Sequence, residues 1–168
     1  AGDTLKVEIL EGEAGGAVTL DSVLALSNGT DLKVGTPFVK GAKVVACSRN
    51  EKTLQTLRAS FNFSQDTLLT TSCDVSRHAE VEAMVAAGVK RFGRIDGLVN
   101  NAGLYPTTPL LDLSEQEWDK VLDTNLKGPF MCSKAAAREM IAQGVKGHIV
   151  NISSTASLIS RPGTVHYA

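Results

Sequence analysis

The first forty residues alternate apolar and polar side chains in the way that is typical of β-strands. Residues 5–9 alternate strictly, and a second apolar run covers residues 17–26. Residues 27–31 contain Asn and Gly, which tolerate the positive φ angles of tight turns, and residues 32–34 resume the strand pattern. Because no helical periodicity interrupts these strands, the sequence predicts a β-meander.

From residue 41 onward the pattern changes to strands that alternate with amphipathic helices. Helices with apolar residues every three or four positions are expected to follow Asn50 and Ser76, which can cap them. Ser114 and Glu117 have the spacing of a capping box and open a third helix, which Pro129 is expected to kink or interrupt. Short apolar strands are predicted at residues 42–47, 67–73, 95–99 and 148–152.

Short connections between these elements predict parallel strands with right-handed crossovers. The change of pattern places a boundary near residue 40. We therefore expect a β-meander segment over residues 1–40 and an α/β segment over residues 41–168, which either stay separate or merge into one domain.

Composition limits the partners and the environment. The chain of 168 residues has a net charge of −1, and residues 1–40 hold six carboxylates against three lysines. This charge balance argues against nucleic acid or an anionic membrane as a binding partner. No apolar run approaches a membrane span and no signal peptide is recognisable, so a cytoplasmic protein is expected. The three cysteines lack metal-ligand spacing and are expected to be buried free thiols in a reducing compartment.

The most specific motif is Asn100-Asn101-Ala102-Gly103, directly after the strand at 95–99. At the carboxyl end of a parallel strand, small residues let the backbone approach a ligand. Asn125 follows on the next helix, and the last strand runs into Asn151-Ile152-Ser153-Ser154. Tyr167 lies thirteen residues after Ser154.

This set of motifs, in this order, resembles the short-chain dehydrogenase/reductase family over residues 41–168. The resemblance implies a truncated Rossmann-like sheet with flanking helices, joined to the N-terminal antiparallel meander, as one mixed sheet if the two segments merge. It also implies catalytic roles by position. Ser154 would hold the substrate carbonyl, Tyr167 would exchange a proton as hydride moves to or from nicotinamide, and Asn125 would anchor a water relay.

The same resemblance implies a cofactor pocket. Asp74 and Val75 match the pair that holds the adenine, and Asn101, Ala102 and Gly103 match the wall beside the cofactor ribose. In such folds a carboxylate after the second strand binds the ribose hydroxyls of NAD. Here Ser48 and Arg49 stand at that position, and a guanidinium suits the 2′-phosphate of NADP.

Two departures from the family pattern weaken these expectations. No Thr-Gly-x-x-x-Gly-x-Gly turn, which would take the pyrophosphate, is recognisable. The family motif Tyr-x-x-x-Lys is also not completed, because Ala168 is the residue after Tyr167. The site residues are therefore expected to be vestigial, with no cofactor bound tightly and NADP the choice if any binds. His166 has no partner that the sequence identifies.

A second resemblance covers residues 3–45, which are similar to part of bacterial ribosomal large-subunit protein twenty-one. The stretch Val34-Gly35-Thr36-Pro37-Phe38-Val39 carries most of it. That family folds as a small β-barrel and binds ribosomal RNA. Because this segment is acidic and lacks a basic tail, RNA binding is not expected.

Together the two resemblances lead to the hypothesis of a recombined or artificial chimera without evolved catalytic activity. The alternatives are an NADP(H)-dependent carbonyl reductase or alcohol dehydrogenase, completed in one version by a partner chain, and an RNA-binding β-domain. A strand of the N-terminal segment is expected to enter the sheet antiparallel, in the place of the family's first strand, or else to exchange between two chains in a homodimer.

Overall fold

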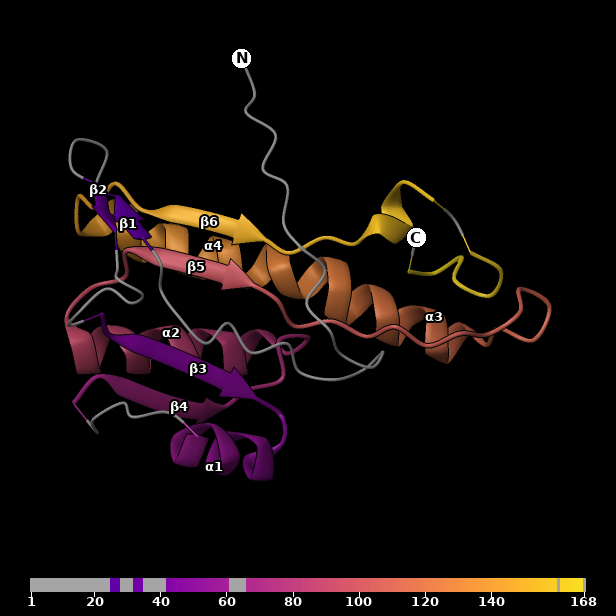
Figure 1. Ribbon diagram of the computed structural model, residues 1–168, viewed down its shortest axis with the longest axis horizontal. Coiled ribbons are helices and arrows are strands. Elements are labelled where there is room, and N and C mark those ends of the chain that lie inside the picture. Colours follow the sequence, from indigo (N-terminus) through magenta and orange to yellow (C-terminus); the bar gives the residue numbers. More distant parts are fainter. Residues whose placement is uncertain (1–24, 28–31, 35–41, 61–65, 160, 168) are drawn as a thin grey trace, which may run out of the picture.

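Two pairs of parallel strands form the centre of the molecule. The computed structural model describes residues 25–27, 32–34, 42–60, 66–159 and 161–167 of the chain. Strand β3 (Val44–Ser48) pairs in parallel with β4 (Leu68–Ser72), and β5 (Gly97–Asn100) pairs in parallel with β6 (His148–Asn151). The four arrows point the same way, so their carboxyl ends lie at one edge (Figure 1).

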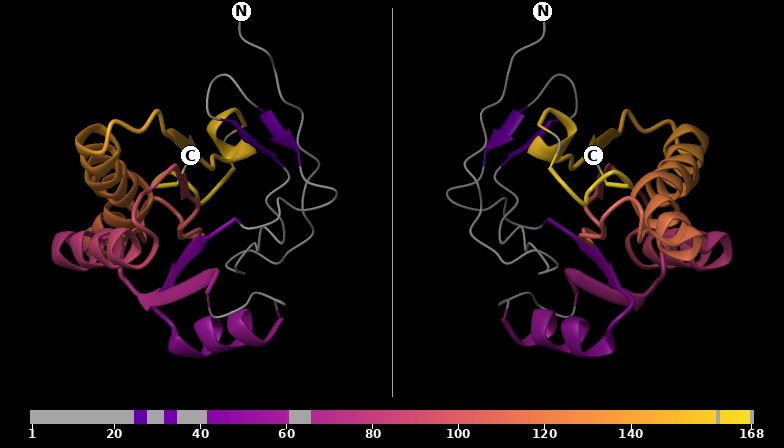
Figure 2. Two further views of the ribbon diagram at one scale, coloured as in Figure 1. Left: turned by 90° about the vertical axis from the view of Figure 1, so that its left-hand side faces the viewer. Right: turned by 90° about the vertical axis from the view of Figure 1, so that its right-hand side faces the viewer.

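Helices connect these strands as the sequence predicts. Helix α1 (Glu51–Ser60) joins β3 to β4, and α2 (His78–Phe92) joins β4 to β5. Between β5 and β6 the chain forms α3 (Glu115–Leu122), the π-helical turn η1 (Asp123–Lys127) and α4 (Gly128–Ala142). A single 3₁₀ turn, η2 (Thr155–Ser157), follows β6. Helices α2 and α4 lie together on one side of the strands (Figure 2).

Two of the three predicted helix caps are confirmed. The Asn50 side chain accepts a hydrogen bond from the Lys52 amide at 2.9 Å, and Ser114 accepts one from the Glu117 amide at 3.2 Å. The prediction for Ser76 is wrong, because α2 begins two residues later, at His78. The Ser76 amide and hydroxyl donate to Asp74 instead, at 3.0 and 2.7 Å, which holds Ser76 in the preceding turn.

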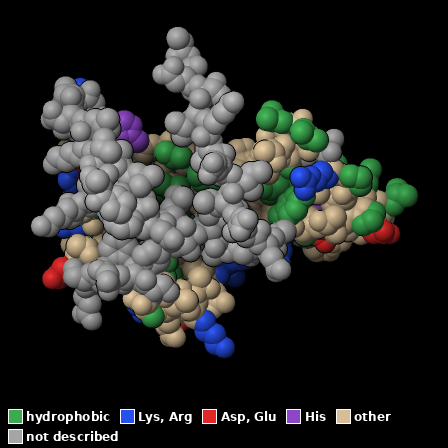
Figure 3. Space-filling model, in the orientation of Figure 1, with side chains coloured by type: hydrophobic (Ala, Val, Ile, Leu, Met, Phe, Trp, Pro, Cys, Tyr) green, Lys and Arg blue, Asp and Glu red, His purple; other side chains and the backbone are tan. Residues whose placement is uncertain are grey.

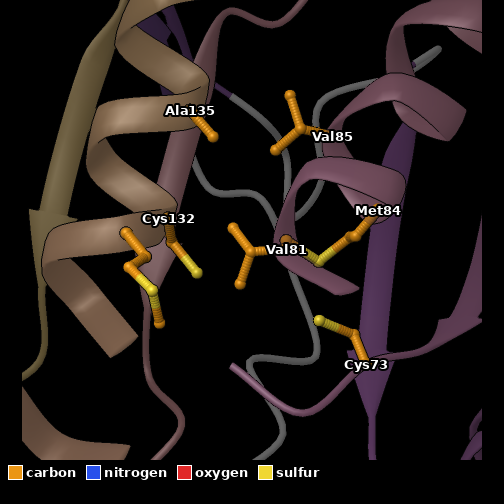
Figure 4. Packing of buried hydrophobic residues seen from close by; sticks show 7 residues of the cluster. Cys73, Val81, Met84, Val85, Cys132 and Ala135 are labelled. Atoms are coloured by element: carbon orange, nitrogen blue, oxygen red, sulfur yellow. The ribbon is translucent and has the colours of Figure 1, made fainter. Parts of the chain in front are cut away.

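The hydrophobic core lies where α2 and α4 meet each other and the strands. Val81, Met84 and Val85 of α2 face Cys132 and Ala135 of α4, and Cys73 closes the cluster beyond β4 (Figure 4). Val45 of β3 and Leu98 of β5 pack against the same cluster. Each parallel pair therefore contributes to one shared core, although no hydrogen-bonded ladder joins β3 to β5 among the described residues.

The N-terminal segment differs from the expected meander. Strand β1 (Ala25–Ser27) pairs antiparallel with β2 (Leu32–Val34), across the predicted turn. The strands expected at residues 5–9 and 17–24 lie outside the described residues, so the meander is not supported beyond this pair. The single mixed sheet is also not observed, because β2 pairs with β1 and, among the described strands, with neither β3 nor β5.

Apolar side chains gather on the surface at the end of the molecule that holds α3 (Figure 3). The large apolar side chains that are exposed in the described part of the chain include Leu110, Leu111, Leu158 and Ile159. Among the described residues, no helix is long and apolar enough to cross a membrane.

Replacing Leu54 with Ala tests the packing of α1. The side chain is 2% exposed, so its truncation leaves a cavity and should lower the free energy of unfolding by about 2–5 kcal/mol. Leu111→Ala is the matched control, because Leu111 is 96% exposed and its loss should change stability by less than about 0.5 kcal/mol. Urea denaturation measures both, and equal effects in the two variants would contradict the packing described here.

Candidate functional site

The carboxyl ends of β3 and β4 bring together two of the predicted cofactor residues. Arg49 follows β3 and Asp74 follows β4, and the guanidinium lies 3.9 Å from the carboxylate. The Arg49 side chain is 48% exposed, so it remains accessible to a ligand while Asp74 holds it in place. Ser48 is engaged locally, because its hydroxyl accepts a hydrogen bond from the Asn50 amide at 3.1 Å.

Asp74 is held in its charged form. Partial burial alone would raise the pKa of this carboxyl, but it is outweighed by hydrogen bonds from Ser76 and by the guanidinium groups of Arg49 and Arg77. Together these groups lower the pKa of Asp74 below its ordinary value. A carboxylate in this place can accept hydrogen bonds from an amino group such as that of adenine.

Val75, the second predicted adenine residue, lies against the start of α4. A Cβ atom on Gly128 would come within 2.9 Å of the Val75 Cγ2 atom. Glycine at position 128 therefore allows the helix to approach the 73–75 turn closely. The position of Val75 is thus set by packing between two segments that are more than fifty residues apart.

Hydrogen bonds between side chains join the carboxyl ends of β5 and β6. Asn100 donates to Asn151 at 2.8 Å and to Ser133 of α4 at 3.0 Å. This arrangement fixes the point at which the predicted ribose wall leaves the strand. The wall itself, Asn101, Ala102 and Gly103, is exposed.

Asn125 holds the loop that follows this wall. It lies in the π-helical turn η1, where the Gly128 amide donates to the Asp123 carbonyl, five residues back. Pro129 lacks the N–H that would bond the Asn125 carbonyl in a regular α-helix, which explains why the ladder changes here. The Asn125 carboxamide accepts from the Leu104 amide and donates to the Leu104 carbonyl, both at 2.8 Å. Pro129 thus alters the helix through a π-helical turn, and α4 continues without a break.

The predicted catalytic residues Ser154 and Tyr167 lie in the segment after β6. Ser154 caps the start of η2, and its hydroxyl oxygen accepts a hydrogen bond from the Ala156 amide at 3.2 Å. The Tyr167 ring packs edge-on against Tyr105, with 4.4 Å between the ring centroids. Tyr105 directly follows Leu104, so the contact brings Tyr167 to the loop that Asn125 holds.

The sequence did not identify three residues of this region, Tyr105, Glu117 and His166. The His166 side chain is fully buried, with its Nε2 atom 3.1 Å from a carboxylate oxygen of Glu117. The sequence identified no partner for His166, and the structure places Glu117 beside it. Glu117 was recognisable only as a capping residue, because nothing local points to a contact across 49 positions of sequence.

The two buried thiols, Cys73 and Cys132, pack in the hydrophobic core and have raised pKa values. Burial, together with nearby thiols and carboxylates, raises the pKa of Cys73 to about 12, and burial beside Cys73 raises that of Cys132 to about 11. Both thiols therefore stay protonated at neutral pH and are poor nucleophiles. Cys47 is exposed, contrary to expectation. Among the described residues no cluster of His, Cys, Asp and Glu could hold a metal ion.

We call the two hydrogen bonds between the Asn125 carboxamide and the Leu104 backbone the clamp on Leu104. Replacing Asn125 with Asp tests this clamp. The carboxylate would face the Leu104 carbonyl in place of the amide donor, which should cost about 1–3 kcal/mol of unfolding free energy. Asn151→Asp is the control, because the Asn151 side chain accepts the bond from Asn100 and a carboxylate keeps that acceptor. Thermal denaturation at neutral pH compares the two, and equal stability of the two variants would refute the clamp.

Family models match both parts of the chain. The model described as short chain dehydrogenase matches residues 34–168, and the model described as Ribosomal prokaryotic L21 protein matches residues 1–56. Both resemblances expected from the sequence are confirmed. The two matches overlap over residues 34–56.

Individual proteins extend the first match. The chain is 38% identical over 159 residues to the short chain dehydrogenase/reductase astE of Aspergillus oryzae, which covers 94% of this chain and 56% of that protein. A short chain dehydrogenase from Bacillus anthracis has a TM-score of 0.73 at 33% identity and covers 77% of this chain and 54% of its own. A gluconate 5-dehydrogenase from Burkholderia cenocepacia, solved with NADP and tartrate, has a TM-score of 0.65 at 37% identity, with 76% and 49% covered.

These matches overturn the hypothesis of a chimera without catalytic activity. The alignment with the Aspergillus protein extends well into the first forty residues, so the relationship is not confined to residues 41–168. The chain spans about half the length of the relatives described here. The model that matches residues 34–168 covers most of the sequence, and the chain belongs to the short chain dehydrogenase family.

Proposed function

We propose that this chain functions as an NADP(H)-dependent oxidoreductase that interconverts a carbonyl and an alcohol. The observation that carries the proposal is the Arg49–Asp74 pair at the carboxyl ends of β3 and β4. Its half-exposed guanidinium can bind a phosphate, and Asp74 can accept a bond from an adenine amino group. The NADP complex of the related gluconate 5-dehydrogenase supports this choice of nucleotide.

The donor set on this edge fits the adenosine half of NADP(H). Arg49 would hold the 2′-phosphate, Asp74 and Val75 would hold the adenine, and Asn101, Ala102 and Gly103 would line the ribose. Ser48 is tied to the Asn50 amide and would support the loop that carries Arg49. When bound, NADP(H) supplies or accepts the hydride.

The chain's own residues would handle the carbonyl oxygen. The Ser154 hydroxyl accepts from the Ala156 amide, which leaves its O–H to donate to the substrate carbonyl. The Tyr167 phenol would give its proton to that oxygen in the reduction and take it back in the oxidation. Asn125 would anchor a water that relays the proton, since Pro129 cannot donate to its backbone carbonyl.

A nucleotide titration tests the cofactor assignment. Arg49→Gln removes a charge-assisted contact worth about 1.5–3 kcal/mol, so NADPH affinity should fall about 10- to 100-fold while NADH affinity stays unchanged. Arg58→Gln is the matched control, because Arg58 lies on α1, is 52% exposed and pairs with Glu51. Isothermal calorimetry measures the affinities. Failure of the chain to bind NADPH, or an equal loss for both nucleotides, would sink the assignment.

Turnover tests the role of Tyr167. With NADPH and a panel of small ketones and aldehydes, Tyr167→Phe should lower kcat at least about 100-fold, because the proton donor is lost while the ring remains. Tyr105→Phe keeps the ring contact and should retain activity. Absorbance of the reduced nicotinamide follows the reaction. Turnover that Tyr167→Phe leaves unchanged would contradict the proposed chemistry.

A further inference from the structure

A buried imidazole lies directly beside Tyr167. The residue His166 is 3% exposed, and its side chain is fully buried. Neither ring nitrogen has a hydrogen bond of good geometry within the described residues. A buried polar ring without well-aligned bonds is costly, so some other interaction must fix it here.

That interaction is with Glu117, at the start of α3. The Glu117 Oε1 atom lies 3.1 Å from His166 Nε2 and also accepts a hydrogen bond from the Thr108 hydroxyl at 2.6 Å. The contact between Glu117 Oε1 and His166 Nε2 is short, but its geometry is not that of a hydrogen bond. The Glu117 side chain thus makes tertiary contacts in place of the local bond that a capping box would predict.

Further contacts attach the turn at residues 163–167 to the loop at residues 107–108. The Thr108 amide donates to the Gly163 carbonyl at 2.8 Å, and the Tyr167 amide donates to the Thr164 carbonyl at 2.9 Å. Thr164 is 1% exposed. A Cβ atom on Gly163, which has a φ of +78°, would come within 2.8 Å of the Thr107 side chain. The turn that leads to Tyr167 is therefore packed against residues 107–108.

Two interactions, between Asn125 and Leu104 and between Glu117 and His166, set the positions of the two tyrosine rings. Asn125 fixes Leu104 and so sets the position of Tyr105, while Glu117 fixes His166 and so sets the position of Tyr167. The two rings meet at 4.4 Å between centroids. The loss of either interaction should move one ring relative to the other.

We propose that Glu117 and His166 are positioning residues that fix the Tyr167 phenol over the site, an inference that rests on the proposed function of Tyr167. The carboxylate of α3 holds the imidazole, and the imidazole holds the peptide that carries the phenol. Neither residue is assigned contact with substrate or cofactor.

The test measures the position of Tyr167 without relying on activity. The chain has only two tyrosines, so NMR can follow the nuclear Overhauser effect between the Tyr105 and Tyr167 rings. Glu117→Gln keeps an acceptor for Thr108 and removes the charge that faces His166. We expect this variant and His166→Asn to weaken the ring-to-ring signal at least twofold, and the double variant to weaken it no further.

A matched pair on the surface supplies the control. His78 and Glu82 of α2 are 3.8 Å apart with both side chains exposed. The variants His78→Asn and Glu82→Gln should leave the tyrosine signals unchanged. Should His166→Asn fail to fold, Glu117→Gln alone decides the question. An unchanged ring-to-ring signal in folded Glu117→Gln overturns the proposal.

Kinetics separate this inference from the proposed function. If Tyr167 is the proton donor, its displacement in Glu117→Gln should lower kcat about 10- to 100-fold with little change in KM. Glu117→Asp should restore part of the loss, because it keeps the charge. A weakened ring-to-ring signal with unchanged kcat would support the positioning role and would contradict the assignment of Tyr167 as the proton donor. Full turnover in Tyr167→Phe would overturn the proposed function itself, whatever the NMR signal shows.

Discussion

The packing of α2 against α4 is the contact on which the rest of the structure depends. Within the described residues the strands form two separate parallel pairs, and no backbone ladder connects β3 with β5. What joins the pairs is a shared core, in which Val81 and Val85 of α2 meet Cys132 and Ala135 of α4. Each pair also contributes a side chain to this core, Val45 and Leu98, and all four strands run in a common direction.

That common direction produces the candidate site. Parallel strands end at the same edge, so residues from four separate parts of the sequence lie along that edge. Arg49 reaches Asp74 across one pair of strands, and Asn100 reaches Asn151 across the other. The close approach of Gly128 to Val75 connects α4 to the turn beyond β4. The part of the site assigned to the nucleotide therefore depends on helix packing, such as that of α4 against Val75, and not on strand pairing alone.

The side assigned to proton transfer depends on hydrogen bonds and on the contact between Glu117 and His166. The π-helical turn presents Asn125 to the Leu104 peptide, and Glu117 contacts the buried ring of His166. Both contacts start from the long helical segment between β5 and β6. This segment therefore positions the two tyrosines at once, from two places about two turns apart.

The sequence by itself determined the order of strands and helices from residue 42 onward, the family, and the edge at which the motifs gather. Hydrophobic periodicity, caps such as Asn50 and motifs such as Asn100–Gly103 depend on neighbours a few residues away, so they can be recognised without a structure. The wrong prediction for Ser76 also concerns near neighbours in the sequence, because the Ser76 hydroxyl bonds to Asp74 instead of capping the helix. Only the tertiary structure decided that Glu117 would meet His166 and that Asn125 would bind the Leu104 peptide. These contacts join positions that are far apart in the chain or compete with other partners, and their energies depend on burial that only the folded core creates.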